Sequence, residues 1–166
     1  MTEKTAGKGE DAGWLVLIYR VPPEPTRLRS TVWRRIKSLG AIYLQNSAAA
    51  LPASAATERA LRKLRREIIE MSGTAVLLSC SVLAGEPDVR KAFQAARNDE
   101  YEEIVDKCED FLQQVKKEYA ANHFTYAELE ENEVDLVKLH GWFAKVRDRD
   151  VFGAEGRQAA EKALDE

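Results

Sequence analysis

The sequence predicts an α+β protein: a ferredoxin-like domain with an antiparallel sheet, followed by a C-terminal α-helical hairpin and a short helix. Two observations predict this class. Strand-length apolar segments and amphipathic segments of helical period follow each other in the order β-α-β-β-α-β between residues 14 and 83, which is the ferredoxin-like order with both helices on one face. Beyond residue 88 only helical spacing is visible. We therefore expect a disordered tail at 1–13, a ferredoxin-like domain at 14–87 and a helical extension at 88–166.

The first strand and the first helix are separated by a proline-rich turn. Residues 14–21 are apolar almost throughout and stop at two prolines, which is typical of an inner strand with an abrupt end. Thr26 is a candidate N-cap for the helix, and Gly40 is a candidate end. Between them, apolar residues at helical spacing predict a buried stripe of Leu28, Val32, Ile36 and Leu39.

A hairpin, a second helix and a fourth strand follow. Segments 41–45 and 48–51 flank a turn-forming Asn-Ser pair and predict the hairpin, although alanine is a weak strand former. Residues 54–72 have the amphipathic pattern of a helix that the next glycine ends, and residues 74–83 are typical of a strand. The expected buried stripe of this helix consists of Thr57, Leu61, Leu64, Ile68 and Met71.

Two long helices and a short one are expected in the C-terminal part. The first runs from near Val89 to Ala121, and a capping box at residues 125–128 begins the second, which reaches about Asp148. We expect the two to form an antiparallel hairpin. The alternating Arg and Asp residues at 147–150 can support local ion pairs, each worth only about a few tenths of a kcal/mol on a surface. The inward residues of the second helix are expected to be Leu129, Leu136, Leu139, Phe143 and Val146.

The charge of the chain is divided unevenly along the sequence. Residues 1–91 contain 15 Lys and Arg against 9 Asp and Glu, whereas residues 92–166 contain 10 against 19, so the halves carry net charges of +6 and −9. A basic half indicates an anionic partner such as nucleic acid. The acidic half indicates a partner surface or a cover for the basic half.

Most of the positive charge lies on the two helices of the expected ferredoxin-like domain. Over residues 20–70 there are 11 basic and 4 acidic residues, and the outer faces of two adjacent helices should merge into one positive surface. Guanidinium groups bind two phosphate oxygens at once, so we expect this surface to contact the DNA backbone. The expected contacts are Arg27, Arg34, Lys37, Arg59, Arg62, Lys63 and Arg66, with Arg29, Trp33 and Arg35 as secondary candidates.

Other interpretations of these residues stay open. The basic faces are also compatible with an ordinary solvated helix surface, or with a surface that the acidic C-terminal helices cover in the same molecule. Trp33 is able to stack on a base. A tryptophan on a helix flank more often packs at the edge of the core, and this is the favoured prediction for Trp33. Trp14 and Trp142 are expected in the core or in the packing of the hairpin.

The sequence contains no pattern that indicates an enzyme. There is no glycine-rich phosphate loop and no Cys-x-x-Cys pair. His123 and His140 are not at metal-ligand spacing, and a structural role is expected for His140. Cys80, in an expected inner strand, and Cys108, on a helical apolar stripe, are interpreted as small core residues. We therefore expect no catalytic residue, no metal and no cofactor.

The expected location is the cytoplasm. No apolar run reaches the ~18 residues that a membrane-spanning helix needs, so no membrane association is expected. Residues 1–13 lack the apolar core of a signal peptide. With only two cysteines, a disulfide-free cytosolic protein is the default.

Two stretches of the sequence, residues 14–52 and residues 142–164, resemble the chromate-resistance regulator family, the ChrB proteins. Residues 14–52, WLVLIYRVPPEPTRLRSTVWRRIKSLGAIYLQNSAAALP, resemble the start of the family, and residues 142–164, WFAKVRDRDVFGAEGRQAAEKAL, are similar to its "KIRARDFFGA" segment. The resemblance implies the N-terminal domain of a transcriptional regulator of chromate efflux genes. The residues that match the first pattern are Arg27, Arg29, Trp33, Arg34, Lys37, Leu39, Gly40 and Pro52.

A more distant resemblance links residues 14–52 to the ferredoxin-like domain of phenylacetate-degradation repressors. That domain in turn resembles the small nucleases of CRISPR spacer acquisition, which bind a metal through an aspartate at the end of the first strand. Here Arg20 stands where that carboxylate would be needed, and a cation opposes metal binding. Arg20 is therefore evidence against nuclease chemistry, whereas the shape that the resemblance implies permits dimerisation and nucleic-acid contact.

The leading hypothesis is a DNA-binding transcriptional regulator linked to chromate resistance, with double-stranded DNA as its partner. The alternative is an oxyanion-binding sensory or accessory module, in which Arg20 and Arg27 near a helix N-terminus hold the tetrahedral chromate dianion. A third hypothesis, a chromate-handling redox enzyme, would need a reactive thiol or a cofactor site, and neither is visible. A homodimer is a further candidate assembly.

Overall fold

The computed structural model describes residues 13–122 and 125–166. The chain divides into two compact units, which we call the N-terminal unit, up to Val89, and the C-terminal unit, Arg90–Glu166. The predicted tail at 1–13 lies outside the described residues except for Gly13, and so does the predicted histidine position His123.

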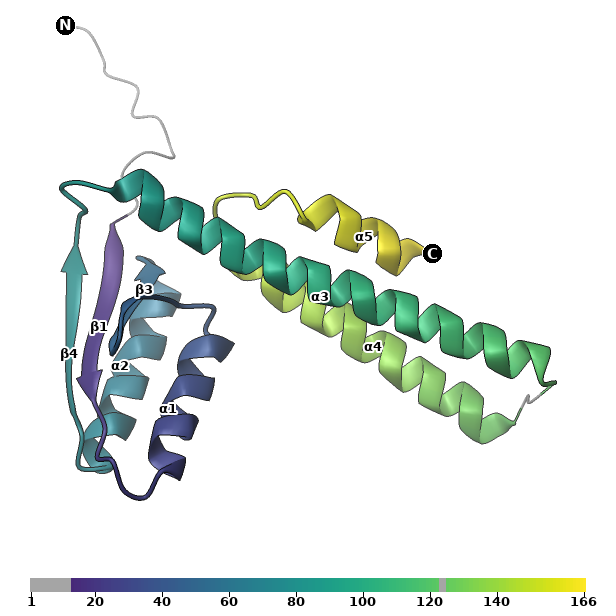
Figure 1. Ribbon diagram of the computed structural model, residues 1–166, viewed down its shortest axis with the longest axis horizontal. Helices are drawn as coiled ribbons and strands as arrows, with labels where there is room; N and C mark the ends of the chain where they lie inside the picture. Colours follow the sequence, from purple (N-terminus) through teal and green to yellow (C-terminus); the bar gives the residue numbers. More distant parts are fainter. Residues whose placement is uncertain (1–12, 123–124) are drawn as a thin grey trace, which may run out of the picture. The chain divides into compact units, whose positions relative to one another are not determined.

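The N-terminal unit contains a four-stranded sheet with two helices on the same side of it (Figure 1). The strands lie in the order β2-β3-β1-β4, and every pair of neighbours is antiparallel. The α+β class, the antiparallel sheet and the order of the elements predicted from the sequence are therefore confirmed. The elements are β1 Trp14–Arg20, α1 Arg27–Ser38, β2 Ile42–Gln45, β3 Ala48–Pro52, α2 Ala55–Glu70 and β4 Thr74–Cys80.

Local signals explain where the two helices begin and end. Ser54 caps α2 through its hydroxyl, which accepts from the Thr57 N–H, while the Thr57 hydroxyl accepts from the Ser54 N–H. The chain leaves α2 at Gly73, where a Cβ would lie only 2.5 Å from the carbonyl oxygen of Arg20, so glycine is required there. Thr26 precedes α1 as predicted, but it has helical dihedrals and its side chain forms no capping hydrogen bond.

The core of the N-terminal unit lies between the sheet and the helices. Val32 and Ile36 of α1 and the predicted stripe of α2 at Leu61, Leu64 and Ile68 are buried, whereas the outer members of both predicted stripes are partly exposed. The central strands β1 and β3 are buried along most of their length. Trp14 is buried, which confirms the prediction for it.

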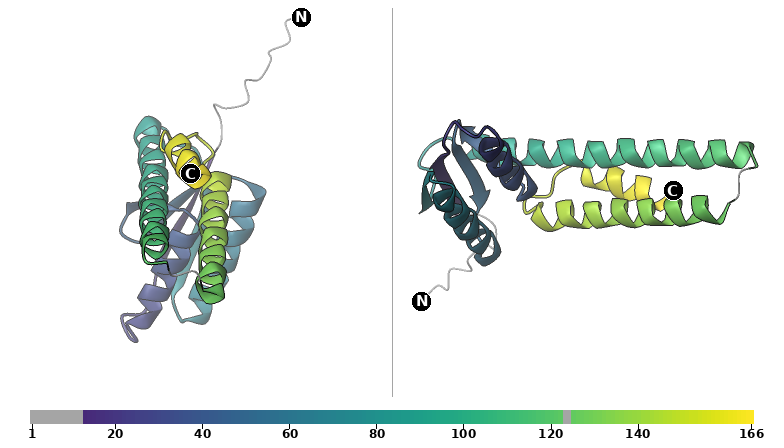
Figure 2. Two further views of the ribbon diagram at one scale, coloured as in Figure 1. Left: turned by 90° about the vertical axis from the view of Figure 1, so that its right-hand side faces the viewer. Right: turned by 90° about the horizontal axis from the view of Figure 1, so that it is seen from below.

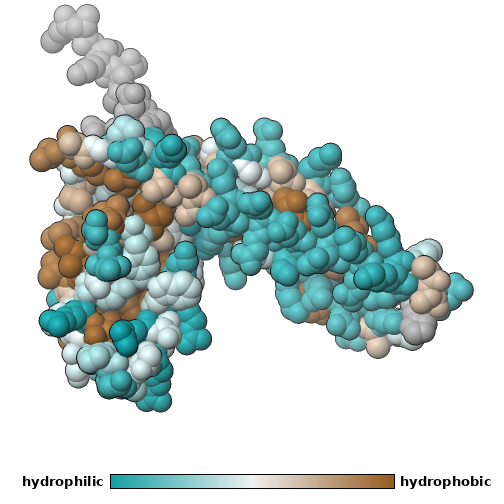
Figure 3. Space-filling view, viewed as in Figure 1, coloured by the Kyte–Doolittle hydropathy of each residue, from teal (hydrophilic) through white to brown (hydrophobic). Residues whose placement is uncertain are grey.

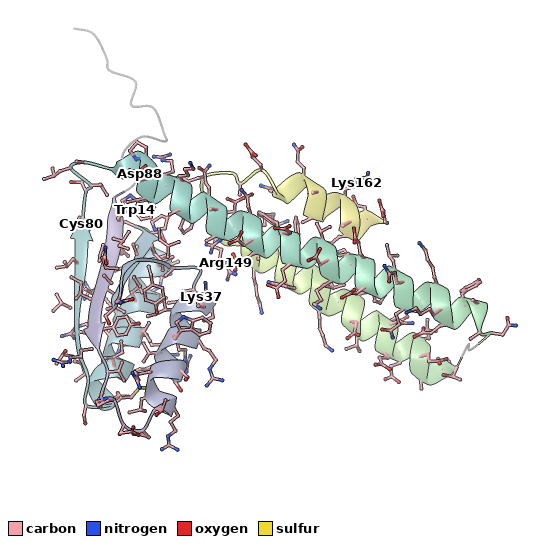
Figure 4. The ribbon with its side chains drawn as sticks, in the orientation of Figure 1. Trp14, Lys37, Cys80, Asp88, Arg149 and Lys162 are labelled. Atoms are coloured by element: carbon pink, nitrogen blue, oxygen red, sulfur yellow. The ribbon has the colours of Figure 1, made fainter. Side chains whose placement is uncertain are left out.

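The predictions for Cys80 and Trp33 were wrong. Cys80 is exposed, because β4 is an edge strand rather than an inner one and ends at this residue. Figure 4 labels Cys80 and its neighbour Trp14, the register partner across the β1–β4 pair. Trp33 is 52% exposed instead of packed at the edge of the core, because its position on α1 turns away from the buried residues Val32 and Ile36.

The described residues of the C-terminal unit form three helices, which confirms the predicted helical part. The helices are α3 Glu86–Ala120, which begins just before the unit, α4 Tyr126–Arg149 and α5 Arg157–Asp165. Figures 1 and 2 show α3 and α4 side by side, with α5 along one end of the pair. Thr125 and Glu128 form the predicted capping box at the start of α4. None of the helices in the described part is long and apolar enough to cross a membrane.

The core of this unit is concentrated at the end where α5 packs. It contains Tyr101, Ile104, Cys108, Phe143, Val146, Ala154 and Ala160, with Leu139 and Trp142 packed against it. The prediction that Leu129 and Leu136 point inward was wrong, since both are exposed. Both residues precede the part of α4 that packs in this core, which begins at Leu139. His140 is also exposed, so the structure gives no packing role to this residue.

A buried polar cluster joins α3, the end of α4 and the loop before α5. Arg97, which is only 2% exposed, places its Nε 2.6 Å from Glu100 Oε2. Arg149 also forms an ion pair with Glu100. The carboxylate of Asp150 accepts from the Tyr101 hydroxyl at 3.1 Å and from the Ala154 N–H at 3.0 Å. Of the residues at 147–150, Arg147 and Asp148 form a local surface pair at 3.5 Å, as the alternation allows, whereas Arg149 and Asp150 bind distant residues instead.

Burial changes the ionisation of groups in this cluster. It lowers the pKa of the Arg97 guanidinium, an effect that neighbouring Glu100 opposes. Burial, followed by the negative charge of Asp150 and the hydrogen bond to it, raises the pKa of Tyr101 to about 12. Burial also raises the pKa of the Cys108 thiol.

Tyr101 should make the stability of the protein sensitive to alkaline pH. In the unfolded chain the phenol loses its proton near pH ~10, whereas in the folded chain it keeps the proton up to about pH 12. The stabilisation of the folded state by the protonated Tyr101 hydroxyl is therefore complete below pH ~10 and is lost as the pH rises towards 12. We expect the stability difference between wild type and Tyr101→Phe to shrink over this interval in urea unfolding.

The matched control for this prediction is Tyr126→Phe, because Tyr126 lies in the same unit and is exposed. Its stability should follow that of wild type at every pH. A stability difference for Tyr101→Phe that stays constant between pH 8 and 11.5 would contradict the assignment.

Candidate nucleic-acid interface

Helix α1 combines a narrow buried stripe with a strongly cationic outer surface. All five of its basic residues are exposed, and the helix contains no carboxylate. Only one of them forms an ion pair with an acidic residue in the described part of the chain: Arg35 Nε lies 3.7 Å from Glu67 Oε2 of α2. The positive charge of the other residues, Arg27, Arg29, Arg34 and Lys37, is therefore not balanced by side chains around them.

An open hollow of about 790 Å³ lies at the beginning of α1. Thr26 does not cap the helix with its side chain, although the Leu28 N–H donates to Pro25 O at 3.0 Å. The remaining N–H groups of the first turn form the kind of helix N-terminus at which anions bind. Trp33 forms an aromatic wall of the hollow, and Lys37 Nζ lies 5.9 Å from the centre of its ring. The hollow is lined by Thr26, Arg27, Arg29, Ser30, Trp33 and Arg34.

The cations of α2 fall into two groups. Successive residues of a helix are about 100° apart around its axis, which places Arg59 and Lys63 on the outward face of α2. Both residues are exposed. Arg62 and Arg66 instead line a groove of about 490 Å³ between α2 and strand β4. Arg62 Nε lies 2.8 Å from Glu58 Oε1, so part of its charge is neutralised.

The ten predicted DNA-binding residues are thus all exposed, but they do not form one continuous surface patch. The ion pair of Arg35 with α2 fixes the side of α1 that faces α2, and on the helix Arg29 and Trp33 lie on the opposite flank. Arg62 and Arg66 lie at the far side of α2, next to β4. Between these two flanks the outward arcs carry Arg27, Arg34, Lys37, Arg59 and Lys63. Contact of these residues with DNA stays a prediction.

Sequence reasoning missed Arg65, which also lines the groove beside β4. Its Nε donates to the carbonyl oxygen of Ala75 at 3.0 Å. The residue borders the buried stripe of α2, so a helical projection assigns it to the edge of the core rather than to the surface. The sequence pattern that could have predicted this role is an arginine next to an apolar stripe, because the long aliphatic part of its side chain allows the guanidinium to extend beyond the core.

Of the two residues of the predicted oxyanion site, Arg27 lines the hollow at the start of α1. Arg20 is exposed at the end of β1, and it is not among the residues that line the hollow around Arg27. Over the described ranges, no group of three or more His, Cys, Asp and Glu is placed to hold a metal ion.

The fold and this surface define the class: an α+β protein in which two helices on an antiparallel sheet present arginine, followed by a helical unit. The comparison with family models then identifies the particular family. A model described as "Protein ChrB, N-terminal" matches residues 29–166, and the chain belongs to this family. The family associates the chain with chromate-resistance regulation.

The match includes residues 142–164, the second segment whose sequence resembles the family. It begins after β1, so the resemblance over residues 14–28 rests on the sequence pattern alone. A search of curated proteins found no match, and a search of solved structures found none either.

Proposed function

We propose that the chain is a non-enzymatic, DNA-binding domain of a transcriptional regulator linked to chromate resistance. The proposal is supported by the family match and by one structural observation in particular: α1 carries five exposed cations and no carboxylate, and within the described residues it forms a single ion pair, to the neighbouring helix α2. A solvated surface helix normally mixes charges of both signs. A surface selected to bind phosphates does not need the negative ones.

The contacts divide into a backbone-binding arc and a hollow. Arg27, Arg34 and Lys37 of α1, together with Arg59 and Lys63 of α2, would neutralise phosphates along the strand. The hollow at the start of α1 combines N–H donors, arginine and the exposed ring of Trp33. This combination suits a phosphate with its sugar or an accessible base edge next to it.

A titration with duplex DNA tests this function. Labelled duplex is titrated with the full chain at 50 and 200 mM salt, and fluorescence anisotropy reports binding. With about five phosphate contacts, the logarithm of the affinity should fall with the logarithm of the salt concentration with a slope of about −4.5. Affinity that is undetectable at low salt, or that does not depend on salt, would contradict the proposal.

The second candidate function is oxyanion binding without DNA. One observation favours it: the N–H groups at the start of α1 are not capped by Thr26, and Arg27 is adjacent. Calorimetry with chromate or sulfate in the absence of DNA distinguishes the two functions, because only the second one requires heat of binding from the small anion alone.

A further inference from the structure

Strand β4 has an outer edge of a kind that proteins normally protect. It is the last strand in the order β2-β3-β1-β4, and its seven residues, TAVLLSC, contain no charge and no proline. Edge strands usually carry lysine, proline or a bulge, because an open row of backbone donors and acceptors pairs with other chains. The register of β4 with β1 is regular over all seven residues.

The backbone geometry shows which groups point outward. Strand β1 lies between β3 and β4, and the Tyr19 N–H donates to Ser47 O on the β3 side. Successive residues of a strand direct their backbone groups to opposite neighbours, so Leu15, Leu17 and Tyr19 turn theirs away from β4. Their register partners in β4 turn outward in the same way, and these are Ala75, Leu77 and Ser79. The hydrogen bond from Arg65 to the carbonyl of Ala75 agrees with this assignment.

A positively charged groove runs along this edge. Leu77 and Ser79 line it on the strand side, and α2 contributes one carboxylate, Glu58, and three arginines. Glu58 is paired with Arg62, and Arg65 is held by the strand itself. Arg66 has no ion pair or hydrogen bond to another side chain within the described residues. The side chains that line the groove therefore carry a net charge of +2.

The opposite face of the same edge is apolar. Val76 is 56% exposed and Leu78 is 42% exposed, and beside them on β1 lies Ile18, which is 47% exposed and is the register partner of Val76. Figure 3 shows apolar side chains gathered on the side of the N-terminal unit where β4 lies. The edge thus has a basic side and an apolar side, separated by a row of open backbone groups.

We propose that this edge binds an extended acidic segment of a partner protein as an added antiparallel or parallel strand. Successive side chains of a strand point to opposite faces. A segment with carboxylates at every second position would place them under Arg62, Arg65 and Arg66, while the intervening apolar side chains would cover Val76 and Leu78. Backbone hydrogen bonds to Leu77 and Ser79 give affinity, and the alternation gives specificity.

Charge selects this occupant over a second copy of the chain. Pairing of β4 with β4 across a two-fold axis would bring two sets of Arg62, Arg65 and Arg66 together, and like charges repel. The proposal does not depend on DNA binding, and its test contains no DNA.

The first test uses a labelled nine-residue peptide in which four glutamates alternate with three valines between terminal threonines. The control peptide has the same composition with its glutamates in one block. Fluorescence anisotropy with the full chain should show binding of the alternating peptide and at least about tenfold weaker binding of the block peptide. Absence of binding by the alternating peptide, or equal binding of both, overturns the proposal.

Variants of the chain locate the binding. Arg66→Glu should weaken binding of the alternating peptide about tenfold or more, whereas Arg59→Glu, on the outward arc of the same helix, should change it much less. Ser79→Pro removes an outward N–H that no strand of the sheet uses, so it should abolish binding without unfolding the sheet. Circular dichroism checks the fold of each variant.

Two outcomes of these measurements would overturn the assignment. Equal weakening by Arg66→Glu and Arg59→Glu would indicate general attraction between opposite charges. Self-association of the wild type that Ser79→Pro prevents, measured by sedimentation, would show that a second copy occupies the edge.

Discussion

Replacing Glu100 by glutamine should lower the free energy of unfolding by about 3 kcal/mol, because it leaves two guanidinium groups without their shared anion. Arg97 and Arg149 both pair with Glu100, and the side chain of Arg97 is only 3% exposed. Removal of one partner from a buried ion pair costs far more than the pair contributes, since the remaining charge stays away from water. The effect should be visible as a lower midpoint in urea unfolding followed by circular dichroism.

Glu103→Gln is the control for this substitution. Glu103 lies on the same helix, α3, one turn later, but it is exposed. Its replacement should change the free energy of unfolding by no more than about 0.5 kcal/mol. If both variants are equally stable, the cluster does not hold the C-terminal unit together.

The double charge reversal Arg34→Glu with Lys63→Glu should weaken binding to duplex DNA about 100-fold at 0.1 M salt. Both residues lie on the outward arcs of their helices, and no carboxylate pairs with either of them in the described residues. The loss of two phosphate contacts should also make the salt dependence shallower, by about 2 in the slope. Anisotropy titrations at several salt concentrations measure both quantities.

A control variant with the same change in net charge distinguishes the loss of local phosphate contacts from a change in the overall electrostatic field of the protein. Lys117→Glu with Lys162→Glu alters two exposed lysines of the C-terminal unit, and Lys162 is labelled on α5 in Figure 4. This variant should keep most of the affinity. Unchanged affinity of the Arg34 and Lys63 variant, with an intact circular dichroism spectrum, would refute the proposed surface.

The sequence was sufficient for the elements whose signals are local. The capping box of Thr125 with Glu128, the stripe at Leu61, Leu64 and Ile68, and the abrupt end of β1 all depend on neighbours within a few residues. The errors concern long-range packing. Cys80 was placed in the core because an apolar strand does not reveal whether it lies inside a sheet or at its edge.

The candidate sites show the same limit. The helical period alone could place Arg34 and Lys63 on outer faces, and the structure leaves both exposed. It could not show that Arg65 reaches the backbone of β4, or that Arg149 and Asp150 turn inward to join residues 49 positions earlier in the chain. Such contacts depend on how distant elements come together. The contacts of Arg149 and Asp150 also give a physical role in packing to residues 142–164, the segment whose sequence resembles the ChrB family.

The two cysteines differ in a way that is useful in the laboratory. Thiol-specific reagents react with the thiolate, so a buried cysteine with a raised pKa reacts slowly. Cys108 is of that kind, whereas Cys80 is exposed at the end of β4. A maleimide dye or spin label should therefore attach at one defined position of the unaltered chain, at the end of the edge strand β4.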